Sequence, residues 1–469
     1  MSATLGVIAT ADAFARGEIS AEAATAAALS RLHSIANLNA IAALNPDAAL
    51  EQAQAQDRAR ARGQTLGPLA GVPMAHKDLF FRKGRASHCG SIIAAGAVSD
   101  TTASVLTRLD EAGAIDLGTL HMAEFALSPT GYNEHYGHGH NPWNPGHICG
   151  GSSSGSGIAV AARAIPASLG TDTGGSLRHP AAACGLTGLK PTHGAVSVAG
   201  AMALSATLDT VGPLATNARD AARIMDVIAG EDRADPTTAW APVLHHEAAL
   251  TGQIGGLTLA RPRGYYEGEL DATIATALND AAATLAGLGA TLVETTAPEM
   301  AAANAFAHLV MAVEAATLHR HWLTTRPQDY AAQVRARIEP GLCYPATAYA
   351  GALMRRGALA RDWIETVMGG ADLALLPAFP IPLPTIAKTT EGAAQDVARV
   401  IGTLTRNTRA INYLGLPAIA FPIGFDEAGL PIACQIVGRP WSEPLLLRIA
   451  DAFQQEIDFH TRQPERAAP

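Results

Sequence analysis

Hydrophobic and polar positions follow different patterns along the chain, and these patterns predict its elements. Residues 1 to about 65 are rich in Ala at helical spacing, with Ser20 placed as an N-cap, and predict N-terminal helices. Residues 300–370 also follow a helical pattern. Short apolar runs bounded by turn residues predict strands, which in the second half of the chain lie at 257–260, 290–293, 373–376, 418–421 and 433–437.

Two of these runs predict a β-α-β unit. The segment between 257–260 and 290–293 begins with Asp271, a plausible N-cap, and its apolar residues recur at helical spacing. With the other strands and helices, this unit favours a mixed sheet wrapped by helices. From 67 to about 229, glycines and prolines crowd together and polar clusters separate short apolar runs. Because functional residues concentrate on loops, we expect the site in this part of the chain.

Composition and charge exclude several classes of function. Of the 469 residues, 16% are charged and 48% hydrophobic, which favours a compact globular protein over a disordered one. The formal net charge of −9 argues against a surface that binds nucleic acid or anionic lipid, so small molecules are the expected partners. The five cysteines are scattered, which favours a reducing compartment and a cytoplasmic protein. The longest nearly apolar stretch, Met300 to Val313, is shorter than the ~20 residues of a bilayer span, so no membrane span is expected.

The run from Gly150 to Gly157 is the most irregular stretch of the chain, and three interpretations compete for it. A phosphate-binding loop would end in Gly-Lys-Ser or Gly-Lys-Thr, whereas Ile158 and Ala159 stand there. A G-x-S-x-G elbow would make Ser153 a nucleophile, although such a match arises easily in a Gly/Ser-rich run. A flexible surface loop is the third interpretation.

A second Gly-rich turn places Ser176 directly after Gly174 and Gly175. Successive backbone N–H groups in such a turn can point at one spot, which is the arrangement that stabilises the oxyanion of an acyl-transfer reaction. A nucleophilic Ser also needs a base. Lys77, one of only four lysines, lies in the apolar segment 72–80, where burial would favour its neutral form.

Three ordered segments resemble the amidase signature family. They run from Gly71 to Asp78, from Gly150 to Gly155 and from Gly170 to Thr192. Between the residues of interest, 75 positions separate Lys77 from Ser152 and 24 separate Ser152 from Ser176, which is similar to the spacing in that family. Further matches extend to Gly438, so the resemblance covers nearly the whole chain.

The resemblance implies a fold and a catalytic triad. It implies one α/β domain with a central mixed sheet of about eleven strands surrounded by helices, and neither a metal nor an organic cofactor. Ser176 would be the nucleophile, Ser152 a bridging Ser preceded by a cis peptide, and Lys77 the base. The oxyanion hole would be formed by the backbone N–H groups of Thr173, Gly174, Gly175 and Ser176. We expect one domain over 1–469, divided into N-terminal helices (1–65), the catalytic core (67–229), a variable substrate-side region (250–370) and C-terminal strands with a helix (371–469).

Residues around the triad receive supporting roles in this interpretation. Gly151, Asp172 and Arg178 are expected to support the catalytic loops. Candidates for substrate binding are Ser128, Thr130, Gly131, His138, His140 and Trp322. The histidines at 135, 138 and 140 match no metal-binding motif, so no metal site is assigned. Mainly apolar walls of the substrate pocket would suit a hydrophobic or aryl substrate. Arg320, Arg355 and Arg356 leave an acidic substrate as an alternative.

Three functions are weighed. The leading hypothesis is an amidohydrolase that cleaves a C–N bond of a small amide, carbamate (urethane) or ureide through a seryl acyl-enzyme. The alternative is the A subunit of a glutamyl-tRNA amidotransferase, which releases ammonia from glutamine for a partner protein. A catalytically silent binding protein is disfavoured because all three triad positions are retained. The sequence leaves open whether the chain forms a homodimer or has a partner subunit.

Overall fold

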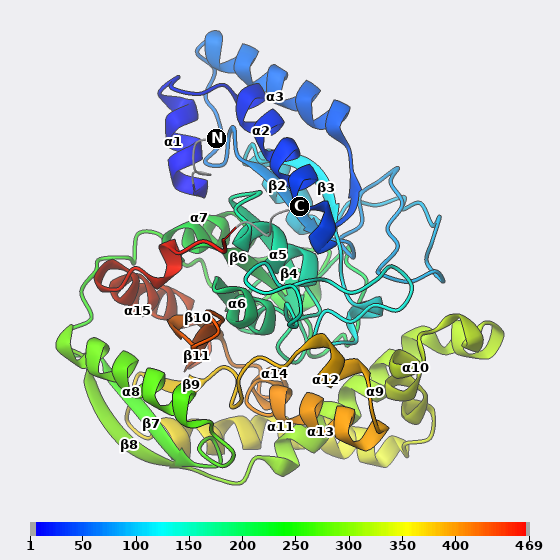
Figure 1. Cartoon of the computed structure of the whole chain (residues 1–469), viewed down its shortest axis with the longest axis vertical. Coiled ribbons are helices and arrows are strands. Elements are labelled where there is room, and N and C mark those ends of the chain that lie inside the picture. The colour runs from blue at the N-terminus through cyan, green and yellow to red at the C-terminus, as the bar shows by residue number, and fades with distance from the viewer. Residues whose placement is uncertain (1–5, 466–469) are drawn as a thin grey trace.

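The strands form two sheets in the computed structural model, which describes residues 6–465 (Figure 1). The larger sheet has eight strands in the order β4-β6-β5-β10-β11-β9-β7-β8 and mixes parallel with antiparallel pairs. The smaller has three strands in the order β1-β3-β2. The strands are β1 (Ile41–Leu44), β2 (Pro73–Lys77), β3 (Ile115–Leu120), β4 (Ala167–Asp172), β5 (Thr187–Lys190), β6 (Thr210–Ala215), β7 (Thr258–Gly264), β8 (Thr291–Ala297), β9 (Leu373–Pro377), β10 (Ala418–Phe425) and β11 (Pro431–Gly438).

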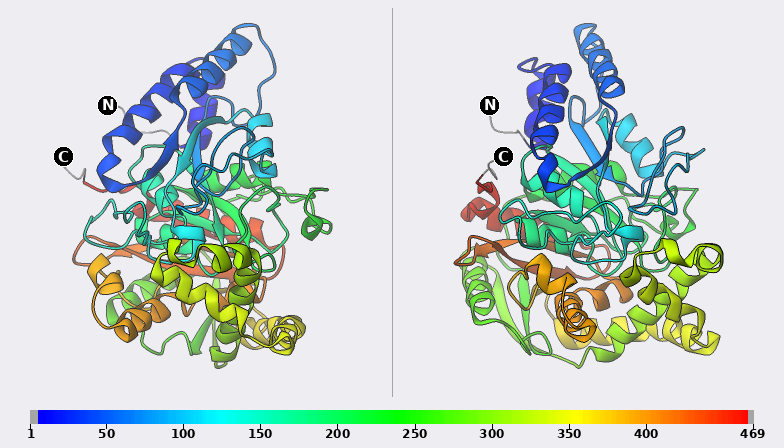
Figure 2. Two further views of the ribbon diagram at one scale, coloured as in Figure 1. Left: turned by 90° about the vertical axis from the view of Figure 1, so that its right-hand side faces the viewer. Right: turned by 45° about the vertical axis from the view of Figure 1, so that its right-hand side comes forward.

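Helices surround both sheets. The α-helices are α1 (Val7–Ala15), α2 (Ala21–Ser34), α3 (Pro46–Ala61), α4 (Ser104–Glu111), α5 (Ser154–Ala161), α6 (Arg178–Cys184), α7 (Ala218–Ile228), α8 (Ala272–Gly287), α9 (Ala301–Thr325), α10 (Ala332–Ile338), α11 (Ala346–Trp363), α12 (Ile386–Thr390), α13 (Ala394–Thr405), α14 (Arg409–Tyr413) and α15 (Glu443–Glu456). The described residues also form short 3₁₀-helices and one π-helix, η6, which are η1 (Ala36–Leu38), η2 (Glu124–Ala126), η3 (Pro236–Thr238), η4 (Pro327–Asp329), η5 (Glu339–Leu342), η6 (Ile364–Met368) and η7 (Phe459–Thr461). In Figure 2, α1 to α3 lie beside the small sheet at one end, and α9 to α11 lie at the other.

The predicted mixed α/β fold is confirmed, but the eleven strands of the described residues divide into two sheets. The division falls between β2 and β4, which lie side by side without a backbone ladder. Side chains join them instead: the Ser168 hydroxyl donates to the carbonyl of Ala75 at 2.6 Å, and His76 Nδ1 accepts from the Leu169 N–H at 3.2 Å. Burial lowers the pKa of His76 to about 3, so its ring is neutral and can accept this bond.

The predicted β-α-β unit is confirmed as β7, α8 and β8. Strands β7 and β8 are parallel, and α8 connects them. Asp271 caps α8 by accepting from the Thr273 N–H at 2.9 Å, and Ser20 caps α2 by accepting from the Ala23 N–H at 3.0 Å. Both caps join residues two or three positions apart, which is why the sequence pattern alone predicts them.

Strand β10 shows how the central sheet is covered on both faces. Ile419 and Phe421 belong to the same core as Leu446 and Phe453 of α15, and the rings of Phe421 and Phe453 are 5.4 Å apart. Between them, Ala420 belongs to the core that contains Leu177 and Ala181 at the start of α6. Because successive strand residues point to opposite faces, α15 and α6 cover opposite sides of β10. Full burial of a side chain such as Phe421 stabilises the fold by about 1.5–3 kcal/mol.

Helix α9 is long and apolar enough, by length and composition alone, to cross a bilayer. It exceeds the apolar stretch noted in the sequence because the helix continues to Thr325. In the fold it packs against α10, α11 and α14. Its buried Glu314 accepts hydrogen bonds from Ser205 Oγ at 2.5 Å and Tyr349 Oη at 2.8 Å, so this face of the helix is part of the protein interior.

Candidate active site

The structure brings Lys77 and Ser152 into direct contact. Lys77 ends strand β2, and its Nζ lies 2.7 Å from Ser152 Oγ and 2.8 Å from Thr171 Oγ1 of β4. Both Lys77 and Ser152 are fully buried. Burial lowers the pKa of Lys77 to about 7, while the carboxylates of Asp209 and Asp172 oppose this shift. A lysine with this pKa is largely neutral just above pH 7, and a neutral amine can accept a proton from Ser152.

Backbone geometry places Ser152 at this point. The Gly151–Ser152 peptide is cis, as the resemblance implies. A Cβ built on Gly151 would stand 2.5 Å from the carbonyl oxygen of Ser128 and 2.7 Å from the N atom of Gly131, so only glycine fits there. Ser153 is buried, and its Oγ donates to the Thr171 carbonyl at 3.3 Å. Helix α5 begins at Ser154, so the Gly/Ser-rich run is a buried turn into a helix and not a flexible surface loop.

Ser176 lies in the turn between β4 and α6 and lines a cavity of about 90 Å³. It is 7% exposed, and its Oγ makes no hydrogen bond within residues 6–465, so Ser152 and Ser176 are not joined in this structure. Gly175 donates its N–H to Asp172 Oδ1 at 2.7 Å. The predicted oxyanion donors without an acceptor in the described part of the chain are therefore the N–H groups of Thr173, Gly174 and Ser176.

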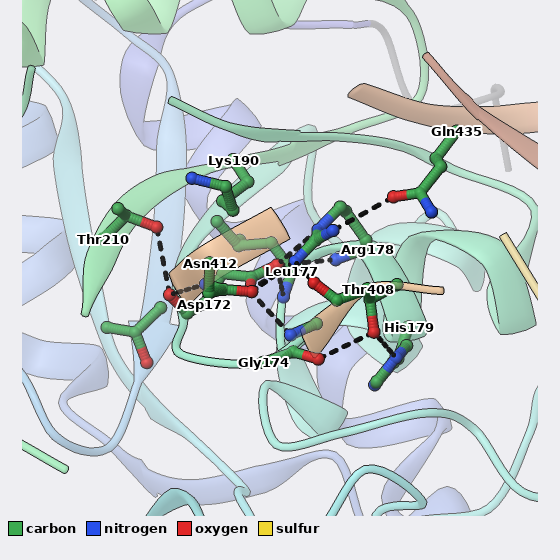
Figure 3. Close-up of polar contacts among 12 residues, drawn as sticks. Asp172, Gly174, Leu177, Arg178, His179, Lys190, Thr210, Thr408, Asn412 and Gln435 are labelled. Atoms are coloured by element: carbon green, nitrogen blue, oxygen red, sulfur yellow. Dashed lines mark hydrogen bonds and ion pairs between the residues drawn. The ribbon is translucent and has the colours of Figure 1, made fainter. Parts of the chain in front are cut away.

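A buried ion pair holds this turn (Figure 3). Asp172, at the end of β4, accepts from Arg178 Nε and Nη2 at 3.0 Å each and from the Leu177 N–H at 3.1 Å. Burial alone would raise the pKa of Asp172, but the charge and hydrogen bonds of Arg178 outweigh it and hold that pKa below its usual range. Arg178 also donates to Gln435 Oε1 at 3.0 Å and Asn412 Oδ1 at 2.5 Å. These contacts agree with the expectation that Asp172 and Arg178 support the catalytic loops.

The sequence motifs assign no role to two residues next to the turn. Thr408 donates its hydroxyl to the Gly174 carbonyl at 2.7 Å and so attaches α14 to the turn. Asp209 accepts from Thr173 Oγ1 at 2.5 Å and from the N–H groups of Leu204 and Ser205 at 2.8 and 3.0 Å. Burial raises the pKa of Asp209 to about 6. Thr171, the second neighbour of Lys77, lies within the motif from Gly170 to Thr192, but only the packing of β4 beside β2 brings it to the lysine.

The walls of the cavity differ from those expected. Apolar residues such as Leu127, Leu204 and Met311 line it, but so do Arg337 of α10 and Arg409 of α14. None of the three arginines considered from the sequence, Arg320, Arg355 and Arg356, lines this cavity. The full lining is Ala126, Leu127, Ser128, Pro129, Thr173, Gly174, Ser176, His179, Leu204, His308, Met311, Arg337, Ile401, Thr405 and Arg409.

Of the residues predicted to bind substrate, Ser128 lines this cavity and the others do not. Thr130 bonds to Ser128 through the two hydroxyl groups, 2.9 Å apart. Gly131 lies against Cys149, where a Cβ would stand 2.5 Å from its Sγ. His138 packs on the ring of Tyr132, with 4.9 Å between centroids, and Trp322 stacks on Phe125 at 5.5 Å. His140 Nδ1 lies 2.9 Å from the Pro145 carbonyl oxygen.

The three histidines near residue 138 do not converge on one point. His135 Nε2 lies 3.1 Å from Glu124 Oε1, whereas His138 and His140 bond to the carbonyls of Asn133 and Pro145. Within residues 6–465 no group of three or more His, Cys, Asp or Glu side chains is arranged to hold a metal ion. The five cysteines are free thiols, and of these only Cys343 is exposed.

The fold and the paired lysine and serine motifs define an amidase signature enzyme, a class that acts on C–N bonds, and comparison with known proteins agrees. The sequence profile of the Amidase family matches residues 23–447, so the chain belongs to this family, as the sequence motifs predict. The A subunit of the glutamyl-tRNA(Gln) amidotransferase of Chloroflexus aggregans is 39% identical over 429 residues, which cover 87% of this chain and 86% of that protein.

Two solved structures have closely similar folds. One is a chain of a vestigial protein complex that reveals the origins of an s-triazine catabolic enzyme; it is 33% identical, with a TM-score of 0.89 over 99% of this chain and 100% of that chain. The other is the native peptide amidase of Stenotrophomonas maltophilia, which is 28% identical, with a TM-score of 0.85 over 99% of each chain.

Proposed function

We propose that this chain hydrolyses the C–N bond of a small amide, carbamate or ureide through an acyl-enzyme on Ser176. The observation that carries this proposal is the buried Lys77, whose Nζ lies 2.7 Å from Ser152 Oγ and 2.8 Å from Thr171 Oγ1, just before the turn that holds Ser176. A neutral Lys77 is a base at physiological pH, and Ser176 is next to backbone N–H groups without an acceptor in the described residues. These are the parts that acyl transfer requires.

In the proposed reaction, Ser176 Oγ forms a bond to the substrate carbonyl carbon. Its proton passes to Ser152 Oγ, while the proton of Ser152 passes to Lys77 Nζ. The negative charge on the carbonyl oxygen is stabilised by the N–H groups of Thr173, Gly174 and Ser176. When the C–N bond breaks, the proton returns along the same route to the leaving nitrogen. Water then releases the acyl group from Ser176 by the same proton transfers.

A second candidate function is glutamine hydrolysis within a glutamyl-tRNA amidotransferase. Its support is the 39% identity to the amidotransferase chain from Chloroflexus aggregans over 87% of this chain, and the similarity to known proteins supports this function better than hydrolysis of a small amide, carbamate or ureide. A partner protein is then expected, and a relative from a vestigial protein complex adds to that expectation. Glutamine itself carries a primary amide, so both candidates use the same chemistry on Ser176. A cytoplasmic location stays a prediction.

The nucleophile is tested with a fluorophosphonate probe and mass spectrometry of the labelled peptide. We expect labelling of Ser176, and Ser176→Ala is expected to lose both labelling and amide hydrolysis. Ser153→Ala is the matched control, because Ser153 is buried nearby and bonds to the Thr171 carbonyl. It should keep labelling at Ser176. Labelling of Ser153 in the wild-type protein would instead support the elbow interpretation and overturn the triad.

A further inference from the structure

Two arginines line the cavity beside Ser176 without a carboxylate partner. Arg337 donates one N–H to the carbonyl of Leu127, and Arg409 donates one N–H to Thr405 Oγ1. Within residues 6–465, neither guanidinium has an Asp or Glu oxygen within ion-pair distance. A guanidinium has five N–H donors, so each arginine has several left for a molecule in the cavity.

The two charges stand close together, which is costly without an anion. Burial, together with the nearby charge of Arg409, lowers the pKa of Arg337 to about 10. Burial also lowers the pKa of His308 on the same wall, and both arginines add to that shift. At neutral pH Arg337 and Arg409 remain protonated and His308 neutral. Desolvated like charges without partners destabilise a protein, so this arrangement indicates a ligand that neutralises them.

Arg409 is held next to the reacting centre. Its methylene stem lies against Gly174, where a Cβ would stand 3.7 Å from Arg409 Cγ. The preceding residue, Thr408, donates to the Gly174 carbonyl at 2.7 Å, so α14 and the oxyanion turn are one unit. Arg337 is attached to the carbonyl of Leu127, which also lines the cavity. The arginines therefore flank the space in which the acyl part of a short substrate would lie.

We propose that Arg337 and Arg409 bind a carboxylate on the substrate, so that the preferred substrate is a short amide or ureide with an anionic group and no ammonium group. This inference rests on the proposed function, because it names the substrate class of that same site. A planar guanidinium matches a carboxylate with two parallel hydrogen bonds, and two of them can neutralise one or two anionic charges.

The described cavity wall has no acidic residue, and this is why we expect the preferred substrate to lack an ammonium group. None of the described residues that line the cavity is Asp or Glu. Asp209 lies nearby, but its oxygens accept bonds from Thr173, Leu204 and Ser205. The α-ammonium of glutamine would thus lack a partner of opposite charge and would face Arg337 and Arg409. Such unpaired like charges are how a site rejects a near-isosteric molecule.

The test compares three amides of nearly equal length: glutaramate, which is anionic; glutamine, which adds an ammonium; and pentanamide, which lacks the carboxylate. Ammonia release gives kcat/KM for each, with succinamate as a shorter anionic substrate. We expect kcat/KM for the better anionic amide to exceed that for both glutamine and pentanamide by about 10- to 100-fold. Equal values for glutaramate and pentanamide, or a preference for glutamine, would overturn the inference.

Substitutions of Arg337 and Arg409 test whether these two residues cause the preference for an anionic amide. Arg337→Met and Arg409→Met should each raise KM for the anionic amide by about 10-fold or more relative to any change in KM for pentanamide. Arg335→Met is the matched control on α10, since Arg335 pairs with Glu339 at the surface. It should change neither substrate. Arg409→Glu should shift the preference from glutaramate towards glutamine.

The two proposals fail in different ways. A wild-type protein that hydrolyses pentanamide and is labelled on Ser176, but shows no preference for an anion, would leave the proposed function intact and remove this inference. A protein that hydrolyses none of the amides and is not labelled on Ser176 would remove the proposed function itself. Circular dichroism and the melting temperature of each variant show whether a lost activity reflects lost folding.

Discussion

At the scale of the residue, the surroundings of a lysine decide what it can do. Burial lowers the pKa of both Lys77 and Lys190 to about 7. Lys190 Nζ donates to the Pro191 carbonyl at 2.7 Å, and Figure 3 shows the Lys190 side chain beside the Asp172 and Arg178 cluster. Lys77 alone of the two meets a serine hydroxyl. Desolvation favours the neutral amine of Lys77, which can act as a base. The contact with Ser152 provides the hydroxyl proton that this base can accept.

The depressed pKa of Lys77 predicts the pH dependence of activity. The neutral amine is the active form, and its fraction rises with pH, so kcat/KM should increase through a single step near pH 7 and then level off. Lys77→Met should lower kcat about 10²- to 10⁴-fold because general-base assistance is lost. Lys83→Met, at an exposed position, is the control and should match wild type. A kcat/KM that is constant from pH 5.5 to 9 would contradict this assignment.

At the scale of the element, one buried ion pair joins parts of the chain that are far apart in sequence. Asp172 ends β4, Arg178 begins α6, Gln435 lies on β11 and Asn412 lies on α14. Asn412 Nδ2 donates to both the carbonyl and Oδ1 of Asp172 at 2.9 Å. The oxyanion turn lies within this cluster, so its shape depends on four elements and not on its own glycines alone.

Removing one partner of this pair should destabilise the whole fold. Arg178→Met would leave the fully buried Asp172 carboxylate without its cation, and we expect the free energy of unfolding to fall by about 3–5 kcal/mol. Urea denaturation followed by fluorescence measures this change. Arg399→Met is the control, because Arg399 and Asp396 form an exposed pair, and its effect should stay within about 0.5 kcal/mol. An Arg178→Met protein as stable as the control would contradict the structural role of the pair.

At the scale of the whole molecule, one chain supplies every group of the proposed site. Lys77 comes from β2 at the small sheet, Ser176 from the turn after β4, and the cavity-lining Arg337 and Arg409 from α10 and α14. The groups of the proposed site therefore come together only in the folded chain.

We therefore expect the purified chain to hydrolyse amides by itself. Activity per chain should stay constant when the protein is diluted 100-fold, and size-exclusion chromatography at each concentration would report the oligomeric state. Hydrolysis of glutamine that begins only when a partner protein is added would contradict this expectation and support the amidotransferase candidate.

Features that depend on neighbours along the chain can be predicted from the amino-acid sequence alone. The caps at Ser20 and Asp271 join residues two or three positions apart, and the β7-α8-β8 unit follows from local periodicity. The motifs around Lys77, Ser152 and Ser176 carry the family, because their residue types and spacing are visible without a structure.

Features that depend on contacts between distant parts of the chain follow from the packing of the folded protein. The division into two sheets follows from side chains that replace a ladder between β2 and β4. Arg337 and Arg409 meet at one cavity although 72 positions separate them, and neither belongs to a motif. Packing of α10 and α14 brings them together without salt-bridge partners among the described residues. Such a pairing leaves no signal in the local sequence. It depends on how deeply the two arginines are buried and on charges from other elements, whose positions in the fold the sequence pattern does not predict.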